Sequence, residues 1–168
     1  MVAPVFCQPS EDYVLRLPPA AFRELPANIV NELQRRRCTI PQEAEARKPN
    51  NVIRGEFAKP GQTDWAVLCS VNGASAILVF WNGSEKNPAA IARFEDGIFL
   101  QELGGGRFGY SRAIRPVGKQ FIMAHYRAQG GPKPPLLDHQ GIDDYFVGKA
   151  SQTWYFHSGK WLKLAGAD

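Results

Sequence analysis

The densest group of potentially reactive side chains lies between Asp138 and Asp144, where three carboxylates and the imidazole of His139 fall within seven residues. Carboxylates beside an imidazole serve general acid–base catalysis, and an oxygen-rich cluster can also bind a metal ion. One interpretation is a hydrolase with His139 as base and Asp143 or Asp144 as its orienting carboxylate. The other interpretation is a helix capped by Asp138, with Asp143 and Asp144 solvated. We favour this second interpretation, because a motif without supporting context is weak evidence for catalysis.

A glycine-rich stretch, Gly104-Gly105-Gly106-Arg107-Phe108-Gly109, offers a second candidate site. Its backbone N–H groups could cradle phosphate, but a phosphate loop should open a helix and carry a lysine. Here the chain continues toward a strand, so a turn is the better prediction. Glycine loops bordered by aromatic residues can also shape a ligand groove. The residues predicted to line such a groove are Tyr110, Arg112, His139, Asp143 and Asp144.

The chain has three cysteines, Cys7, Cys38 and Cys69, with no CxxC pair and no Cys/His cluster. A structural zinc site is therefore not expected, and the sequence predicts no metal and no cofactor. Cys38 and Cys69 are either two small buried hydrophobic residues or a disulfide. We favour the disulfide, which would close a loop of about 30 residues and contribute roughly 3 kcal/mol. Cys7 would then be free or pair between chains.

The elements that position these residues are mostly strands. Apolar residues at three- and four-residue steps predict a helix from Ala27 to Arg37 within a helical region 19–37, after an irregular segment 1–18. Turn signals separate short apolar runs over 51–165. The expected hairpin turns are Asn72-Gly73, Asp96-Gly97 and Ser158-Gly159. Alternation predicts a strand over Lys119–Arg127, and Asp138–Phe146 is predicted as a short helix.

These patterns predict one α+β domain over residues 1–168. It would contain a mainly antiparallel β-sheet of about eight strands, with one N-terminal helix packed on it. The chain has 168 residues, of which 44% are hydrophobic and 21% charged, which excludes a disordered polar chain. A net charge of +4 with a single dense basic run, Arg35-Arg36-Arg37, does not indicate a nucleic-acid binder. No run of 18 apolar residues indicates a transmembrane segment.

The segment from Gly55 to Leu68 resembles the FG-GAP repeat of integrin-type propellers, since Phe57, Gly61 and Asp64 match its spacing. Lys59 occupies a place where calcium-binding repeats carry acidic ligands, so calcium is not expected. A propeller needs several blades and no second copy is present, so we interpret the resemblance as a hairpin type. Asp64 is then predicted to cap its turn by accepting backbone N–H bonds.

Three segments together are similar to a group of small bacterial proteins, uncharacterised and often exported, that carry a degenerate FG-GAP-like hairpin. They are 38–42, 51–70 and 141–151, the last together with 154–156 and 159–162. The resemblance implies no activity, but it favours the Cys38–Cys69 bridge and a periplasmic or secreted location, with its signal peptide absent here. A cytoplasmic location is the alternative. The expected function is a non-enzymatic binding module for a small molecule or a protein partner, of the kind of an envelope or inhibitor-like protein. The hydrolase is the alternative.

Overall fold

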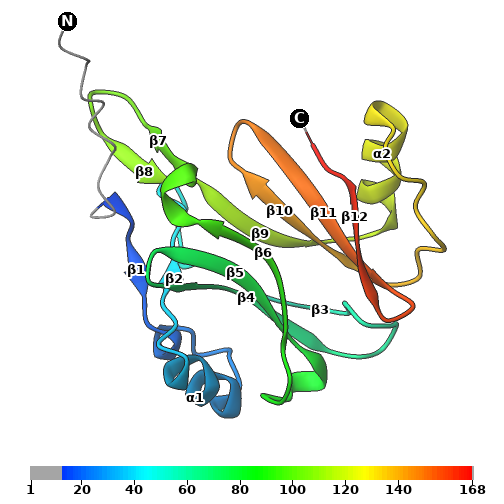
Figure 1. Cartoon of the computed structure of the whole chain (residues 1–168), viewed down its shortest axis with the longest axis horizontal. Coiled ribbons are helices and arrows are strands. Elements are labelled where there is room, and N and C mark those ends of the chain that lie inside the picture. Colours follow the sequence, from blue (N-terminus) through cyan, green and yellow to red (C-terminus); the bar gives the residue numbers. More distant parts are fainter. Residues whose placement is uncertain (1–12, 168) are drawn as a thin grey trace, which may run out of the picture.

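The computed structural model describes residues 13–167, and these form twelve strands in four sheets with two α-helices. The α+β, mainly antiparallel class is thus confirmed, although the expected eight strands and one helix were too few. Two four-stranded sheets lie face to face, and one helix covers the outer face of each (Figure 1). The predictions that concern Cys7 and the other residues before Tyr13 fall outside the described residues.

The first sheet has an antiparallel order that follows the sequence. Its strands are β3 (Val52–Gly55), β4 (Asp64–Val71), β5 (Ala74–Phe80) and β6 (Ala89–Glu95). Asn72 and Gly73, both with positive φ, make the predicted turn between β4 and β5. All seven residues of β5 are buried, as its unbroken apolar run indicates, because both faces of this sheet are covered.

Helix α1 (Ala27–Arg35) covers one face of the first sheet with Ile29 and Leu33, which are fully buried. It ends two residues before the predicted end, where Arg37 adopts a left-handed conformation and the Cys38 N–H bonds back to the Leu33 carbonyl. Cys38 then forms the predicted disulfide with Cys69 of β4, across a sequence separation of 31.

The second sheet packs against the other face of the first. Its strands, in spatial order, are β12 (Lys160–Ala165), β11 (Ala150–His157), β10 (Gly141–Phe146) and β9 (Arg112–Val117). Ile114 and Ile142 of this sheet share a core with Leu68 and Ile77 of the first. The hairpin over Ser158-Gly159 is confirmed between β11 and β12.

The predicted strand over Lys119–Arg127 is wrong, because this segment is helix α2 (Lys119–Gln129). Helix-favouring Lys, Gln, Met, Ala and Arg side chains fill it, and Gly130, with a φ of 73°, ends it. The apparent alternation in the sequence arose from chance spacing of polar residues. Helix α2 buries Ile122 against Tyr155 and Leu164 on the outer face of the second sheet.

The predicted helix over Asp138–Phe146 is also wrong, because strand β10 occupies most of it, between β9 and β11. Asp143 and Asp144 have low strand propensity and were expected to be solvated. They are instead 0% and 8% exposed. Arginines on β9 neutralise both carboxylates, so tertiary contacts override the local preference.

Two short ribbons complete the fold. One pairs β1 (Arg16–Leu17) with β2 (Ile40–Pro41), and the other pairs β7 (Leu100–Glu102) with β8 (Phe108–Tyr110). The expected hairpin at Asp96-Gly97 is wrong, because β6 does not pair with β7. Asp96 instead starts a 3-10 turn, and its carboxylate is buried against Ser70 and Arg16.

Candidate functional site

Three of the predicted binding residues meet between the two large sheets. The Arg112 guanidinium donates from Nε and Nη2 to the two carboxylate oxygens of Asp144, each at 2.8 Å. Arg112 Nη1 also reaches the Ser75 hydroxyl at 3.0 Å, and that hydroxyl lies 3.2 Å from the Tyr110 hydroxyl. Burial raises the pKa of Tyr110, because the phenolate would be desolvated. The cluster is closed to solvent, and Arg112 and Tyr110 are both 0% exposed.

Arg112 also fixes an irregularity in β6. The pairing of β5 and β6 shifts register between Ser75 and Ile77, and Ala92 opposite the shift has a φ of 52°. The Ala92 carbonyl accepts a hydrogen bond from Arg112 Nη2 at 2.6 Å, and the Ser75 carbonyl accepts one from Nη1 at 3.3 Å. The buried cation thus satisfies backbone acceptors around this β-bulge, and it holds the bend in β6 from inside the molecule.

Asp143 points to the opposite face of the second sheet from Asp144, because successive side chains of a strand alternate. There it pairs with Arg115, its cross-strand neighbour, at 2.8 Å. The Arg115 guanidinium lies over the rings of Phe121 and Tyr145. Asp143 is therefore committed to an ion pair under helix α2, away from the Arg112 cluster.

His139 lies apart from both carboxylates of β10. Its ring stacks on Tyr155 with centroids 4.3 Å apart, and its Nδ1 is 3.0 Å from the Gln140 carbonyl oxygen. The nearest acidic partner is Asp138, with 3.9 Å between His139 Nε2 and Asp138 Oδ1. The five predicted residues therefore occupy three separate places in the fold rather than one groove.

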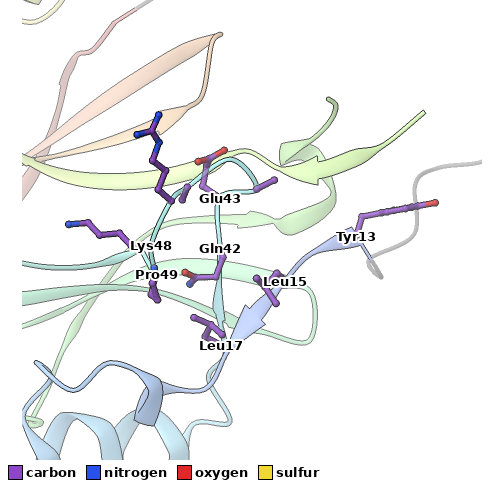
Figure 2. Close-up of a pocket in the computed structure, with 10 residues that line it drawn as sticks. Tyr13, Leu15, Leu17, Gln42, Glu43, Lys48 and Pro49 are labelled. Atoms are coloured by element: carbon purple, nitrogen blue, oxygen red, sulfur yellow. The ribbon is translucent and has the colours of Figure 1, made fainter. Parts of the chain in front are cut away.

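A concave surface that exposes apolar side chains lies beside β1, and we call it the β1 groove (Figure 2). Its volume is about 460 Å³. Leu15 and Leu17 form the floor, and they point to one side of the chain while Arg16 points to the other, toward Asp96. Tyr13 stands at one end of the same row. Tyr13 is 48% exposed and Leu15 is 65% exposed.

The far wall of the β1 groove is the segment 43–49, which Figure 2 shows facing the leucines across Gln42. Gln42 anchors this segment: its side-chain amide donates to the Ile40 and Asn50 carbonyls, and its Oε1 accepts from the Asn50 N–H at 2.8 Å. The Glu43 N–H bonds to Asn50 Oδ1 at 3.2 Å. The ends of the segment are thus joined, and the wall is held without a ligand.

A glycine lets this wall pack closely on the β7–β8 ribbon. The Ala44 N–H donates to the Tyr110 carbonyl at 2.8 Å. A Cβ atom placed on Gly109 would collide with the Cβ of Ala44 and would lie 2.7 Å from Leu103. The glycine-rich stretch therefore contributes to the groove through the missing side chain of Gly109, rather than by binding phosphate.

Exposed charges of both signs border the groove. Arg47 and Lys48 line it, and neither has a side-chain partner within residues 13–167. Glu43 also lines it, but its Oε1 already accepts the Glu45 N–H at 2.9 Å. Two cations against one carboxylate leave an excess of positive charge at the rim.

Sequence reasoning missed the β1 groove, because it interpreted residues 1–18 as an irregular segment with one strand-like piece over 13–17 and assigned no binding role to that piece. The alternation of Tyr13, Leu15 and Leu17 was visible, and it is the signal that could have located the floor. What the pattern lacked was the far wall, which depends on contacts from Gln42 to Asn50 and from Ala44 to a distant ribbon.

Between residues 13 and 167, no three His, Cys, Asp or Glu side chains gather as a metal site would require. Neither helix in that range has the length and apolar character needed to cross a membrane.

Comparison with protein-family models, with curated proteins and with solved structures found no match. The resemblance to FG-GAP-like proteins therefore stays a prediction, and the functional argument rests on the chain itself.

Proposed function

We propose that this protein is a non-enzymatic binding module whose β1 groove receives an extended segment of a partner protein. The observation that carries the proposal is the exposure of Leu15 and Tyr13 along a groove whose opposite wall is already fixed. Exposed apolar side chains gathered at a concave surface mark interaction sites, because covering them removes apolar area from water.

The lining favours a peptide over a small molecule. Sites for small ligands place a few polar groups to orient them. In the β1 groove the buried polar side chain is Gln42, and its amide is already engaged with Ile40 and Asn50. Leu15 and Leu17 are spaced two residues apart, as are alternate side chains of an extended partner chain, which would contact them in turn.

The charge at the rim favours an acidic flank on that partner segment. Arg47 and Lys48 are exposed and unpaired with any side chain of residues 13–167. An Asp or Glu beside the apolar residues of the segment would lie near these cations and would speed association. The expected partner sequence therefore carries apolar residues at alternate positions, followed or preceded by a carboxylate.

The side chains predicted to catalyse hydrolysis form other contacts in the fold, and this supports binding over catalysis. Asp143 and Asp144 each form an ion pair with an arginine, and His139 is stacked on Tyr155. We infer that the protein works outside the cytoplasm, because the Cys38–Cys69 disulfide is of the kind that persists in oxidising compartments.

Selection from a random peptide library displayed on phage tests the proposal. Wild-type protein should enrich peptides with alternating apolar residues and an acidic flank. Leu15→Asp should weaken binding of an enriched peptide by about tenfold or more, since it replaces an apolar contact with a charge. Leu136→Asp is the matched control, because Leu136 is 75% exposed and lies outside the groove, and it should bind as the wild type does. Failure to enrich any peptide, or equal binding by Leu15→Asp, would overturn the proposal.

A further inference from the structure

A second concave surface lies at the C-terminal end of α1, over strands β5 and β6 of the first sheet. Helix α1 has nine residues and therefore spans about 13 Å, which is too short to cover four strands. Beside its end lies a cleft of about 490 Å³, which we call the α1–β6 cleft. This volume falls within the range of roughly 300–1,000 Å³ that is typical of ligand sites.

The body of the α1–β6 cleft is apolar. Ala74, Ala76 and Leu78 of β5 form its floor and are 4%, 8% and 6% exposed. Ala90 and Ala92 of β6 form one wall. Because four of these five side chains are methyl groups, they leave space above the sheet that an apolar chain can occupy.

The polar side chains that line the cleft are both arginines. Arg36 comes from the end of α1 and Arg93 from β6. The Arg36 Nε–H donates a hydrogen bond to Glu32 Oε1 at 2.7 Å. Arg93 is exposed and pairs with no side chain of residues 13–167. No acidic side chain of that range lines the cleft. An anionic group would meet the unpaired guanidinium group of Arg93 and the guanidinium group of Arg36, which keeps two nitrogens for it beside the Nε that Glu32 accepts from.

The wall formed by β6 is fixed from behind. Ala92 is the residue with a φ of 52° in the β-bulge, and its carbonyl points inward to Arg112. A bulge turns its side chains away from the regular alternation of a strand. Arg112 therefore acts as a positioning residue for this wall, although it lies on the inner side of the sheet and does not line the cleft.

From this geometry we propose that the α1–β6 cleft binds a single-chain apolar carboxylate, with its chain along β5 and β6 and its carboxylate at Arg36 and Arg93. Burial of the chain supplies the affinity, at about 0.8 kcal/mol for each methylene group removed from water. Planar guanidinium groups match the two oxygens of a carboxylate, which supplies the selectivity for an anion. This site is independent of the β1 groove, and neither proposal requires the other.

Calorimetric titration of the full chain with dodecanoate, below the concentration at which it forms micelles, tests this proposal. Dodecanol, which has the same chain without the charge, should bind about tenfold more weakly or worse, because hydrogen bonds to charged groups contribute about 1.5–3 kcal/mol. Arg93→Gln should remove most of this difference. Arg107→Gln removes an exposed cation that lies outside both concave surfaces and pairs with no side chain of residues 13–167, and it should leave the difference intact.

A second variant and a second probe keep the test decisive. Ala90→Trp places a large side chain in the cleft from an exposed position, so it should abolish dodecanoate binding while the urea midpoint stays unchanged. Equal binding of dodecanol and dodecanoate would overturn the proposal, as would a wild-type response of Arg93→Gln or Ala90→Trp. Binding to phosphatidylglycerol vesicles without binding to dodecanoate would also overturn it, since the cleft would then recognise a bilayer surface.

Discussion

Arg112 and Asp144 form a two-point ion pair in the space between the two large sheets, with both N···O distances at 2.8 Å. Neither residue is accessible: Arg112 is 0% exposed and Asp144 is 8% exposed. The pair joins adjacent strands β9 and β10, while further bonds from Arg112 reach Ser75 and Ala92 of the facing sheet. One buried cation thus links the two sheets and sets the shape of β6.

Removing one partner of this pair should therefore be costly. We expect Asp144→Ala to lower the free energy of unfolding by about 3–5 kcal/mol, because it leaves Arg112 charged and buried without its counter-ion. Urea denaturation measures this loss. Arg35→Ala, which breaks an exposed pair with Glu32 on α1, is the control and should shift the urea midpoint far less. Similar shifts for the two variants would contradict the account of the buried pair.

Alkaline pH should destabilise the protein through Tyr110. Burial raises the pKa of Tyr110 above its ordinary value, whereas an unfolded tyrosine ionises near pH 10. The contribution of Tyr110 to the free energy of unfolding is therefore fully present below about pH 10 and is lost as the pH rises further. The unfolding free energy of the wild type should fall more steeply above this pH than that of Tyr110→Phe, with Cys7 alkylated to prevent disulfide exchange. Equal slopes would show that Tyr110 does not contribute.

Asp64 should be a strong local stabiliser of the β3–β4 hairpin. Its Oδ2 accepts the N–H groups of Phe57 and Ala58 at 2.9 Å each, and its Oδ1 accepts the Asn82 N–H at 2.8 Å. Asp64→Ala should cost about 3 kcal/mol or more in urea, because hydrogen bonds to a charged group are lost and buried donors are left without partners. Glu45→Ala, at an exposed acidic residue, should leave the midpoint nearly unchanged.

The disulfide should contribute through the loop that it closes. Replacing Cys38 and Cys69 together by alanine should lower the unfolding free energy by about 3 kcal/mol, as expected for a loop of this length. Cys7→Ala should leave the urea midpoint unchanged. A double variant as stable as the wild type would show that the bridge does not constrain the unfolded chain.

Much of the fold followed from local signals in the sequence. Asn72-Gly73 and Ser158-Gly159 make their hairpins because these residues adopt positive φ readily, and Asp64 caps its turn through bonds to residues close in sequence. Cys38 and Cys69 pair as expected. In the two hairpins and the Asp64 turn, the residues that decide the structure lie in the motif itself.

The sequence-based predictions failed where residues that are distant in the sequence determine the local structure. Asp143 and Asp144 lie in a buried strand because Arg115 and Arg112 neutralise them, and nothing near Asp144 in the sequence indicates that. The predicted binding set named three members of the Arg112 cluster, but their burial depends on the facing sheet. The β1 groove likewise needs Gln42, Asn50 and Gly109 to meet, and these lie in different segments.

The rigidity of the β1 groove can be tested at Gly109. Gly109→Ala should displace Ala44 and its segment, because the added Cβ would collide with the Ala44 side chain. Affinity for a selected peptide should fall by about tenfold, comparable to the loss of a single good apolar contact. Gly97→Ala is the matched control, since a Cβ at Gly97 meets nothing within 4 Å, and it should bind normally. Unchanged affinity in Gly109→Ala would show that the wall does not take part.

The central claim is that the β1 groove is where this protein meets a partner segment. Amide chemical-shift mapping of the labelled chain during titration with a selected peptide tests it most directly. We predict that the largest shifts fall on residues 13–17 and 42–48, and that Leu15→Asp abolishes them while Leu136→Asp does not. Shifts centred on the β11–β12 hairpin or on helix α2, with residues 13–17 unaffected, would contradict the claim.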